Sequence, residues 1–337
     1  MKNRFVRSAT HDWLGNPDGS ISEKQLVLYR SLDENDVGLI MSAHAYVDHP
    51  QGRASINQNG IYHDRFIEGY RQLADIAHGH GARFIVQVAH AGVQTMPQLM
   101  EGQLPLNPID MTEDEILKVI DCFAKAVYRV KQAGCDGVQL HLAHGYLLCR
   151  FLSSDANRRE DVWGRPVENR VRIVEEIIKK ARQLVGTDFP ILVKLNSTGG
   201  FSGTAAIELA EVIQIAKALE NLGVCAIEVS GGTVMDTKNS LSRTGIINPK
   251  QEAYFGGAAQ EIKKAVKIPI ILVGGLRFRM VMDRILDDGV ADMVSLSRPF
   301  VREPDLVRRI LSGQQKVSCI SCNLCRDFSG IKCNYKA

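Results

Sequence analysis

The chain has 337 residues, of which 45% are hydrophobic and 23% are charged, as is typical of globular proteins. Its formal net charge of +3 is small for this length and gives no reason to expect nucleic acid or an acidic membrane surface as a partner. No segment approaches the roughly 20 apolar residues of a membrane span, and the N-terminal Met1-Lys2-Asn3-Arg4 is not followed by the apolar region of a secretion signal. We therefore expect a cytoplasmic protein without a membrane partner.

Short β-rich runs alternate with helical patterns along the chain. Several of these runs are almost continuously apolar, as expected for parallel strands that are covered on both faces. Ser22 with Gln25 and Thr112 with Glu115 form capping-box patterns, which predict helix starts, the second helix extending to Gln132. The eight predicted strands are residues 4–9, 37–44, 83–89, 137–142, 191–195, 226–230, 268–273 and 291–296.

Eight alternating units predict an α/β fold of the (β/α)₈ TIM-barrel type and not a doubly wound sheet. No linker rich in Pro, Gly or Ser divides the chain. We expect one barrel over residues 1–312 and a short Cys-rich tail over residues 313–337. Because barrel enzymes carry their chemistry at the C-terminal ends of the strands, the polar residues at those ends are the candidate site.

The fourth predicted strand ends in the run His141-Leu142-Ala143-His144-Gly145-Tyr146. Two imidazole N–H groups can hold a carbonyl oxygen that becomes negative in a transition state, and a nearby phenol can deliver a proton. A zinc site is a rival interpretation, because His-x-x-His can ligate zinc. A third is purely structural, with one His capping a carbonyl and Tyr146 packing in the next layer. The concentration of three such groups at one strand end favours catalysis by His141, His144 and Tyr146.

Two further polar residues lie inside predicted strands. Lys194 shares a strand face with Leu192 and Asn196, and a charge inside a barrel is costly unless an anion answers it. That anion is either a neighbouring carboxylate or the anionic edge of a reduced flavin. Gln87 offers amide donors and an acceptor that match the pyrimidine edge of a flavin, although it equally suits a satisfied amide in the core.

Small and anion-binding residues follow the last three predicted strands, at Ser230-Gly231-Gly232, Gly274-Gly275 and Ser297-Arg298. Glycines allow backbone N–H groups to approach a phosphate, and Arg can bind one through two parallel hydrogen bonds. The loops after strands seven and eight are the usual phosphate site of TIM barrels. These positions therefore predict a phosphate site.

Four of the eight cysteines, Cys319, Cys322, Cys325 and Cys333, lie in the last twenty residues. In a cytosolic chain such a group favours metal binding over disulfides. A tetrahedral zinc site formed by four thiolates is one candidate, and an iron–sulfur cluster is the other.

With these residues in view, the chain resembles the Old Yellow Enzyme family of FMN-dependent ene-reductases, also called NADH:flavin oxidoreductases. The resemblance extends over nearly the whole chain. The run around His141 and the stretch 157–170 are the most specific in combination. The matching stretches are residues 2–10, 44–47, 87–92, 141–148, 151–153, 157–170 and 295–300.

The resemblance implies an FMN site at the mouth of the barrel. One group of residues would contact the flavin ring or approach it through the backbone, and another would bind its pyrimidine edge and its phosphate. The first group is Ser8, Ala9, Thr10, His11 and Ala45. The second group is Gln87 and Lys194 for the pyrimidine edge and Gly274, Gly275, Ser297 and Arg298 for the phosphate.

The resemblance also implies the reaction. NADH or NADPH would reduce FMN, which would then reduce the activated C=C bond of an enone, enal or enoyl thioester. His141 and His144 would bind the substrate carbonyl, and Tyr146 would donate the proton. An FMN-dependent amine dehydrogenase or demethylase is the alternative on this scaffold, but it does not need the His pair. A third hypothesis is a flavin-free barrel that serves as a subunit of a larger complex.

The tail sequence Cys319-Ile320-Ser321-Cys322-Asn323-Leu324-Cys325 resembles the iron–sulfur branch of the family, which includes the barrel domain of 2,4-dienoyl-CoA reductase. This resemblance places a [4Fe–4S] cluster ahead of zinc. Such a cluster would connect FMN with an electron-transfer protein. A homo-oligomer is compatible with the resemblance.

Overall fold

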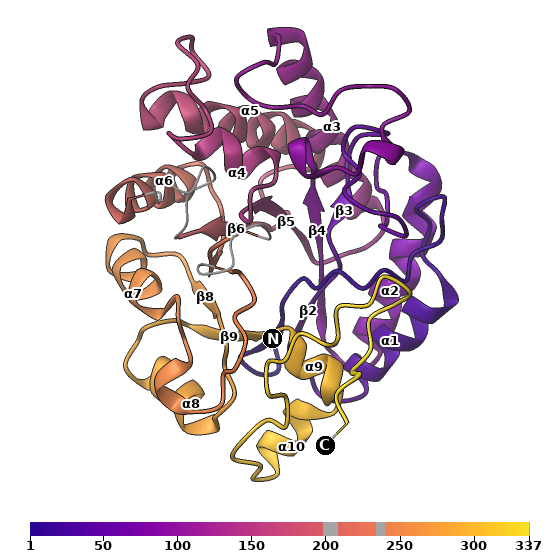
Figure 1. Cartoon of the computed structure of the whole chain (residues 1–337), viewed down its shortest axis with the longest axis vertical. Helices are drawn as coiled ribbons and strands as arrows, with labels where there is room; N and C mark the ends of the chain where they lie inside the picture. The colour runs from indigo at the N-terminus through magenta and orange to yellow at the C-terminus, as the bar shows by residue number, and fades with distance from the viewer. Residues whose placement is uncertain (198–207, 234–239, 337) are drawn as a thin grey trace.

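The computed structural model describes residues 1–197, 208–233 and 240–336. Eight parallel strands close into a barrel inside a ring of helices (Figure 1). Neighbouring strands pair in the order β2-β1-β9-β8-β7-β6-β5-β4, and a further pairing of β2 with β4 closes the ring. The predicted (β/α)₈ barrel is therefore confirmed.

The strands follow the predicted runs closely, and two of them coincide with their predictions. The short β3 pairs with β4 and is not one of the eight strands that form the closed barrel. The observed bounds are β1 Phe5–Arg7, β2 Leu39–Met41, β3 Ala45–Tyr46, β4 Arg83–Ala89, β5 Gly137–Leu142, β6 Ile191–Asn196, β7 Ile227–Ser230, β8 Ile270–Val273 and β9 Met293–Leu296.

The run predicted as one strand over 37–44 is wrong at its C-terminal end, where β2 stops at Met41. Side chains capture the backbone here. The Tyr29 hydroxyl accepts a hydrogen bond from the Ala43 N–H at 2.9 Å, and the Gln58 amide donates to the His44 carbonyl at 3.2 Å. Ala43 and His44 therefore lie between strands β2 and β3, and the His44 side chain is left at the mouth of the barrel.

The helices form where the capping patterns predicted them. Both boxes, Ser22 with Gln25 and Thr112 with Glu115, are present. The observed bounds are α1 Glu23–Asp33, α2 Ile67–Gly79, α3 Glu113–Gln132, α4 Leu147–Leu152, α5 Val167–Val185, α6 Leu209–Asn221, α7 Gly256–Ala265, α8 Arg279–Asp287, α9 Arg298–Arg302 and α10 Leu306–Leu311. None of the helices in the described ranges is both long and apolar enough to cross a membrane.

The barrel interior is layered. Toward the N-terminal ends of the strands a compact apolar cluster fills it, formed by Val6, Leu39, Met41, Ile85, Leu192, Ala226 and Ile271. Side chains alternate across a strand, so a position two residues further on faces the same interior one layer higher. Three of these higher positions are the buried polar residues Gln87, Lys194 and Glu228. The apolar layer thus forms a closed floor beneath a polar layer.

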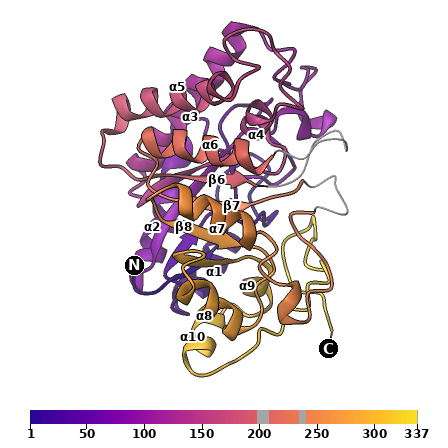
Figure 2. The same cartoon turned by 90° about the vertical axis from the view of Figure 1, so that its left-hand side faces the viewer.

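The tail after α10 crosses the face at which the strands end, opposite the N-terminus (Figure 2). Hydrogen bonds attach it to the barrel. The Arg277 guanidinium donates to the Cys319 carbonyl at 2.9 Å and to the Ser321 hydroxyl at 2.7 Å, and the Ile331 N–H donates to the Asp12 carbonyl at 2.8 Å. The tail therefore borders the mouth of the barrel.

Candidate active site

A cavity of about 570 Å³ lies at the C-terminal ends of the strands. Most of the residues predicted for the flavin and the substrate share it, and the tail completes its wall. The residues that were predicted from the sequence and that line this cavity are Ala9, Thr10, His11, Gln87, His141, His144, Tyr146, Lys194, Ser297, Arg298 and Cys325. Apolar walls come from Trp13, Met96, Phe328 and Ile331, among others.

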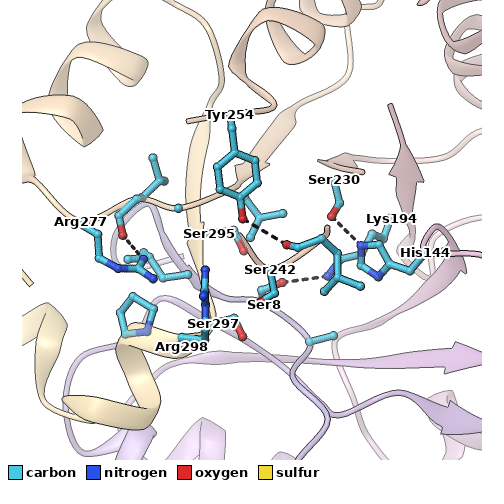
Figure 3. Close-up of a pocket in the computed structure, with 17 residues that line it drawn as sticks. Ser8, His144, Lys194, Ser230, Ser242, Tyr254, Arg277, Ser295, Ser297 and Arg298 are labelled. Atoms are coloured by element: carbon cyan, nitrogen blue, oxygen red, sulfur yellow. Dashed lines mark hydrogen bonds between the residues drawn. The ribbon is translucent and has the colours of Figure 1, made fainter. Parts of the chain in front are cut away.

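A second, smaller cavity of about 80 Å³ adjoins the first, because Ala9, His144, Lys194 and Arg298 line both. Figure 3 shows Lys194 and His144 at one side of it and Arg277 and Arg298 at the other. Ser8 and Gly275 also line it. This cavity connects the predicted pyrimidine edge with the predicted phosphate site.

The predicted phosphate residues lie at the ends of β8 and β9. Gly275 has a φ of +76°, and a Cβ there would come within 2.6 Å of the Tyr254 ring, so this position requires glycine. Gly274, with a φ of +141°, also lies against Tyr254 and Phe255. An aromatic ring thus occupies the space beside both glycines.

Arg298 and Ser297 belong to both cavities. The Arg298 guanidinium donates through Nη1 to the Arg243 carbonyl at 2.8 Å and to the Asn323 side-chain oxygen at 2.7 Å. The Ser297 and Thr10 hydroxyl oxygens are 2.8 Å apart. Arg298 therefore ties the predicted phosphate site to the tail, in which Asn323 follows Cys322.

The His pair is built by the end of β5 and the turn after it. His141 is the fifth residue of the strand, while His144 and Gly145 have φ values of +64° and +86°, which reverse the chain and bring the second imidazole back. The ring centroids are 5.0 Å apart. Burial lowers the pKa of both imidazoles well below the usual value; Lys194 and His44 add to this effect at both rings, and His144 adds to it at His141. Both rings are therefore neutral at pH 7, and each carries one N–H.

The hydrogen bonds of the pair leave donors for a ligand. His144 Nε2 lies 2.8 Å from the Ser230 hydroxyl; if that hydroxyl donates, the imidazole proton is on Nδ1. His141 Nδ1 is buried and has no hydrogen-bond partner among the residues that the structure describes. Since buried polar atoms are nearly always paired, this nitrogen points to a bound ligand.

Tyr146 follows the turn and lines the same cavity. Its hydroxyl lies 3.1 Å from His44 Nε2, and burial raises the pKa of the phenol, which keeps it protonated and able to donate. Burial and Lys194 lower the pKa of His44 to about 4. The neutral His44 thus fixes the phenol, a role that the sequence did not reveal.

Of the neighbouring residues His44 and Ala45, it is His44 that faces the cavity. The resemblance put Ala45 on the flavin ring, but the structure packs its side chain in the hydrophobic core, in register with Val88 of β4. The residue that faces the cavity is His44. His11, predicted beside the flavin, lies next to it, with ring centroids 4.8 Å apart, and its Nε2 is 2.6 Å from the Ser55 hydroxyl.

Lys194 lies beside a carboxylate, which is one of the two anionic partners considered for it, and it also faces the predicted flavin site. It lines the cavity, and its ammonium lies 3.2 Å from Glu228 Oε2 and donates to the Ser8 hydroxyl at 2.9 Å. Lys194 and Glu228 are directly paired across β6 and β7. A carboxylate in the otherwise apolar run 226–229 was the signal that could have identified this partner.

Gln87 is joined to the same carboxylate through Gln139, which the sequence reasoning also missed. Gln87 Nε2 donates to Gln139 Oε1 at 2.7 Å, and Gln139 Nε2 donates to Glu228 Oε2 at 2.9 Å. Burial alone would raise the pKa of Glu228, but Lys194 and these hydrogen bonds hold it below the usual value. Glu228 is therefore an ionised carboxylate in the barrel interior.

The four tail cysteines are free thiols, each partly buried. Burial, together with Cys319 and Cys322, raises the pKa of Cys325. The Arg302 guanidinium lies 3.4 Å from the Cys333 sulfur. Within the described ranges no three His, Cys, Asp or Glu side chains converge to hold a metal ion. The tail thus has the donors of a metal site but not its geometry.

A model of the NADH:flavin oxidoreductase / NADH oxidase family matches residues 1–316. An NADH oxidase from Thermoanaerobacter brockii is 34% identical over 96% of this chain and 51% of its own length. The solved structure of a 2-naphthoyl-CoA reductase in complex with 2-naphthoyl-CoA has a TM-score of 0.84 and 27% identity over 93% of this chain and 50% of that chain.

A shorter neighbour matches almost from end to end. The Old Yellow Enzyme homologue from Zymomonas mobilis has a TM-score of 0.79 and 25% identity, over 95% of this chain and 91% of that one. The chain therefore spans about half the length of the first two proteins and nearly all of the third. On the extent of the family match, the chain belongs to the NADH:flavin oxidoreductase / NADH oxidase family.

Proposed function

We propose that this protein is an FMN-dependent ene-reductase that uses NADH or NADPH to reduce an activated C=C bond. One observation carries the proposal. The His141–His144 pair, Tyr146, Gln87 and Lys194 all line a single cavity of about 570 Å³, within the range of small-molecule and cofactor sites.

The residues present suit FMN. The unpaired His141 Nδ1 and the cavity-lining Lys194 are polar groups that a ligand would satisfy. Gln87 and Lys194 would hold the pyrimidine edge, with Ser8, Ala9, Thr10 and His11 beside the ring. Gly274, Gly275, Ser297 and Arg298 would hold the phosphate. When bound, FMN supplies the hydride chemistry, accepting hydride from the reduced nicotinamide and passing it to the β-carbon of the substrate.

The protein's own groups would act on the substrate. The N–H groups of His141 and His144 would hold the carbonyl oxygen, on which negative charge develops as the β-carbon is reduced. Such donors are effective because they are already oriented and water is excluded. The Tyr146 hydroxyl, held by His44, would give its proton to the α-carbon. Amine oxidation needs no carbonyl activation, so the His pair favours the ene-reductase over the amine dehydrogenase.

The cavity wall favours an apolar, planar substrate. Trp13 and Phe328 pack edge to face with ring centroids 5.4 Å apart, and Met96 and Ile331 add further apolar surface. The likeness to a reductase solved with 2-naphthoyl-CoA supports the inclusion of thioesters beside enones and enals. Apolar activated alkenes of these three kinds are the proposed substrate class.

The tail is proposed to bind a [4Fe–4S] cluster through Cys319, Cys322, Cys325 and Cys333, with zinc as the competing metal. The donor set supports this assignment because thiolates are the usual ligands of both. Such a cluster would exchange electrons with an external protein partner.

Anaerobic half-reactions test the proposed function. Purified protein should be yellow, and NADH or NADPH should bleach the flavin. Adding a panel of enones, enals and enoyl thioesters should restore the flavin absorbance, whereas saturated analogues should not. Protein that binds no flavin, or a reduced flavin that no activated alkene reoxidises, would refute the proposal.

A further inference from the structure

Six buried polar residues form a continuous hydrogen-bonded network in the upper layer of the barrel interior. They come from six different strands or strand ends. The buried polar network consists of Ser8, Gln87, Gln139, Lys194, Glu228 and Ser295. All six are buried, and Glu228 and Gln139 have no solvent-exposed surface.

Glu228 is the centre of this network. Its Oε1 accepts hydrogen bonds from the Ser8 and Ser295 hydroxyls, both at 2.8 Å. Its Oε2 accepts from Gln139 at 2.9 Å and lies 3.2 Å from the Lys194 ammonium. A buried carboxylate with four polar partners is fully satisfied, so its position is fixed.

An ionised carboxylate only accepts hydrogen bonds, and this fixes the direction of the amides beside it. Gln139 must turn its NH₂ group toward Glu228, which leaves its Oε1 to face Gln87. Gln87 must therefore donate to Gln139 through its own NH₂ group. This leaves the Gln87 carbonyl oxygen as an acceptor for a ligand in the cavity that Gln87 lines.

The same carboxylate determines how much of the Lys194 charge reaches the cavity. Lys194 is 3% exposed and lines both cavities, with Glu228 directly opposite on the neighbouring strand. In a site of low dielectric constant, a paired ammonium exerts a weaker field on a third group than an unpaired one does. Glu228 therefore partly neutralises Lys194 as seen from the cavity.

We propose that Glu228 is a positioning residue that sets both the hydrogen-bonding direction of Gln87 and the effective charge of Lys194 toward the isoalloxazine of FMN, and so keeps the flavin reduction potential low. This inference rests on the proposed function in so far as FMN must bind. A low potential favours transfer of hydride from the flavin to the alkene. Glu228 does not line either cavity, so its effect passes through Lys194 and Gln139.

The test is the reduction potential of bound FMN, measured by dye equilibration in the purified holoprotein. Glu228→Gln keeps the side-chain size but removes the charge, and should raise the potential. The preference for reduced over oxidised FMN should increase on the order of tenfold, as expected for loss of a close charge partner. Glu228→Asp keeps the charge and should stay near the parent value. Ser295→Ala removes one hydrogen bond to the same carboxylate and should cause a smaller rise than Glu228→Gln.

A parent potential in Glu228→Gln would overturn the proposal. If Glu228→Gln does not fold, Lys194→Met is compared with the double variant Lys194→Met/Glu228→Gln. The single variant keeps an unpaired carboxylate near the flavin, so the double variant should have the higher potential, and equal potentials would overturn the proposal. Absence of FMN from the parent protein would instead refute the proposed function. The two failures are therefore distinguishable.

Discussion

The mouth of the barrel around β5 and the C-terminal tail both gather reactive side chains, but they hold them differently. At the mouth, His141, His144 and Tyr146 are held by the end of a strand, a left-handed turn and hydrogen bonds to Ser230 and His44. In the tail, the four thiols lie outside helices and strands, and in the described part of the chain no three of them are placed to hold one metal ion. The mouth is therefore organised by the fold itself, whereas the order of the tail would depend on the metal proposed for it.

The largest expected effect tests whether the mouth is a preorganised oxyanion site. His141→Ala and His144→Ala should each slow reoxidation of the reduced flavin by an enone by roughly 10²–10³, the usual cost of losing one such donor. Stopped-flow absorbance under anaerobic conditions measures this rate. Cys225→Ser, which changes an exposed thiol that lines neither cavity, is the control. Parent rates in both His variants would refute the assignment.

The second prediction concerns acid stability. The pKa of His44 is lowered from 6.5 to about 4, so the folded protein prefers the neutral ring. The contribution of the neutral His44 to the free energy of unfolding is fully present above the unfolded-state pKa of about 6.5. It is lost as the pH falls toward 4. It amounts to about 3 kcal/mol between these limits.

Urea unfolding between pH 7.5 and 4.5 measures the effect. His44→Gln keeps a polar side chain without a titrating group, and should reduce the loss of stability in acid. Three other buried imidazoles face the same region and also have lowered pKa values, so part of the loss of stability in acid should remain in this variant. They are His11, His141 and His144. Removal of an exposed histidine, His63→Gln, is the matched control. An unchanged pH dependence in His44→Gln would contradict the depressed pKa.

The third prediction separates proton donation from carbonyl binding. Tyr146→Phe removes the hydroxyl but keeps the ring, so flavin content should be unchanged. Reduction of weakly activated alkenes should fall by roughly 10², at the lower end for general acid catalysis. Strongly activated alkenes depend less on general acid catalysis, so their rate of reduction should fall by less. A parent rate with a simple enone would show that the proton comes from water.

These residues also show where sequence reasoning succeeds. Alternation along its strand was sufficient to place Lys194 on one face with Leu192 and Asn196, and the strand end was sufficient to bring His141, His144 and Tyr146 to the mouth. Each of these conclusions depends on local periodicity, which a sequence contains directly. The capping boxes of α1 and α3 succeeded for the same reason.

What the sequence did not reveal depends on contacts between distant segments. The pairing of Lys194 with Glu228 follows from the register between β6 and β7, which neither strand specifies alone. The position of His44 follows from the early end of β2, where Tyr29 and Gln58 capture the backbone. Arg277, which is buried and binds the tail, was not identified from the sequence at all.

Changes in the tail should have the smallest effect on hydride transfer, although they should abolish binding of the proposed metal. Protein purified without oxygen should be brown, with about four irons per chain and an absorption that dithionite bleaches. Cys319→Ser/Cys322→Ser should remove the iron, while Cys225→Ser, which changes an exposed thiol outside the tail, should not. Stoichiometric zinc and a purely yellow spectrum in the parent would refute the cluster.

The same variants test how the tail contributes to the mouth. Because the thiols do not converge, the free energy of metal binding would have to order the tail. Cys325, Phe328 and Ile331 line the cavity, so a disordered tail would loosen the wall against which an apolar substrate packs. His141 on β5 and Tyr146 at the start of α4 would stay in place. The double Cys variant should therefore raise the KM for an enone severalfold and leave kcat within about twofold, since loss of binding shared by substrate and transition state affects KM alone. A fall in kcat with an unchanged KM would show instead that the tail takes part in the reaction at the mouth.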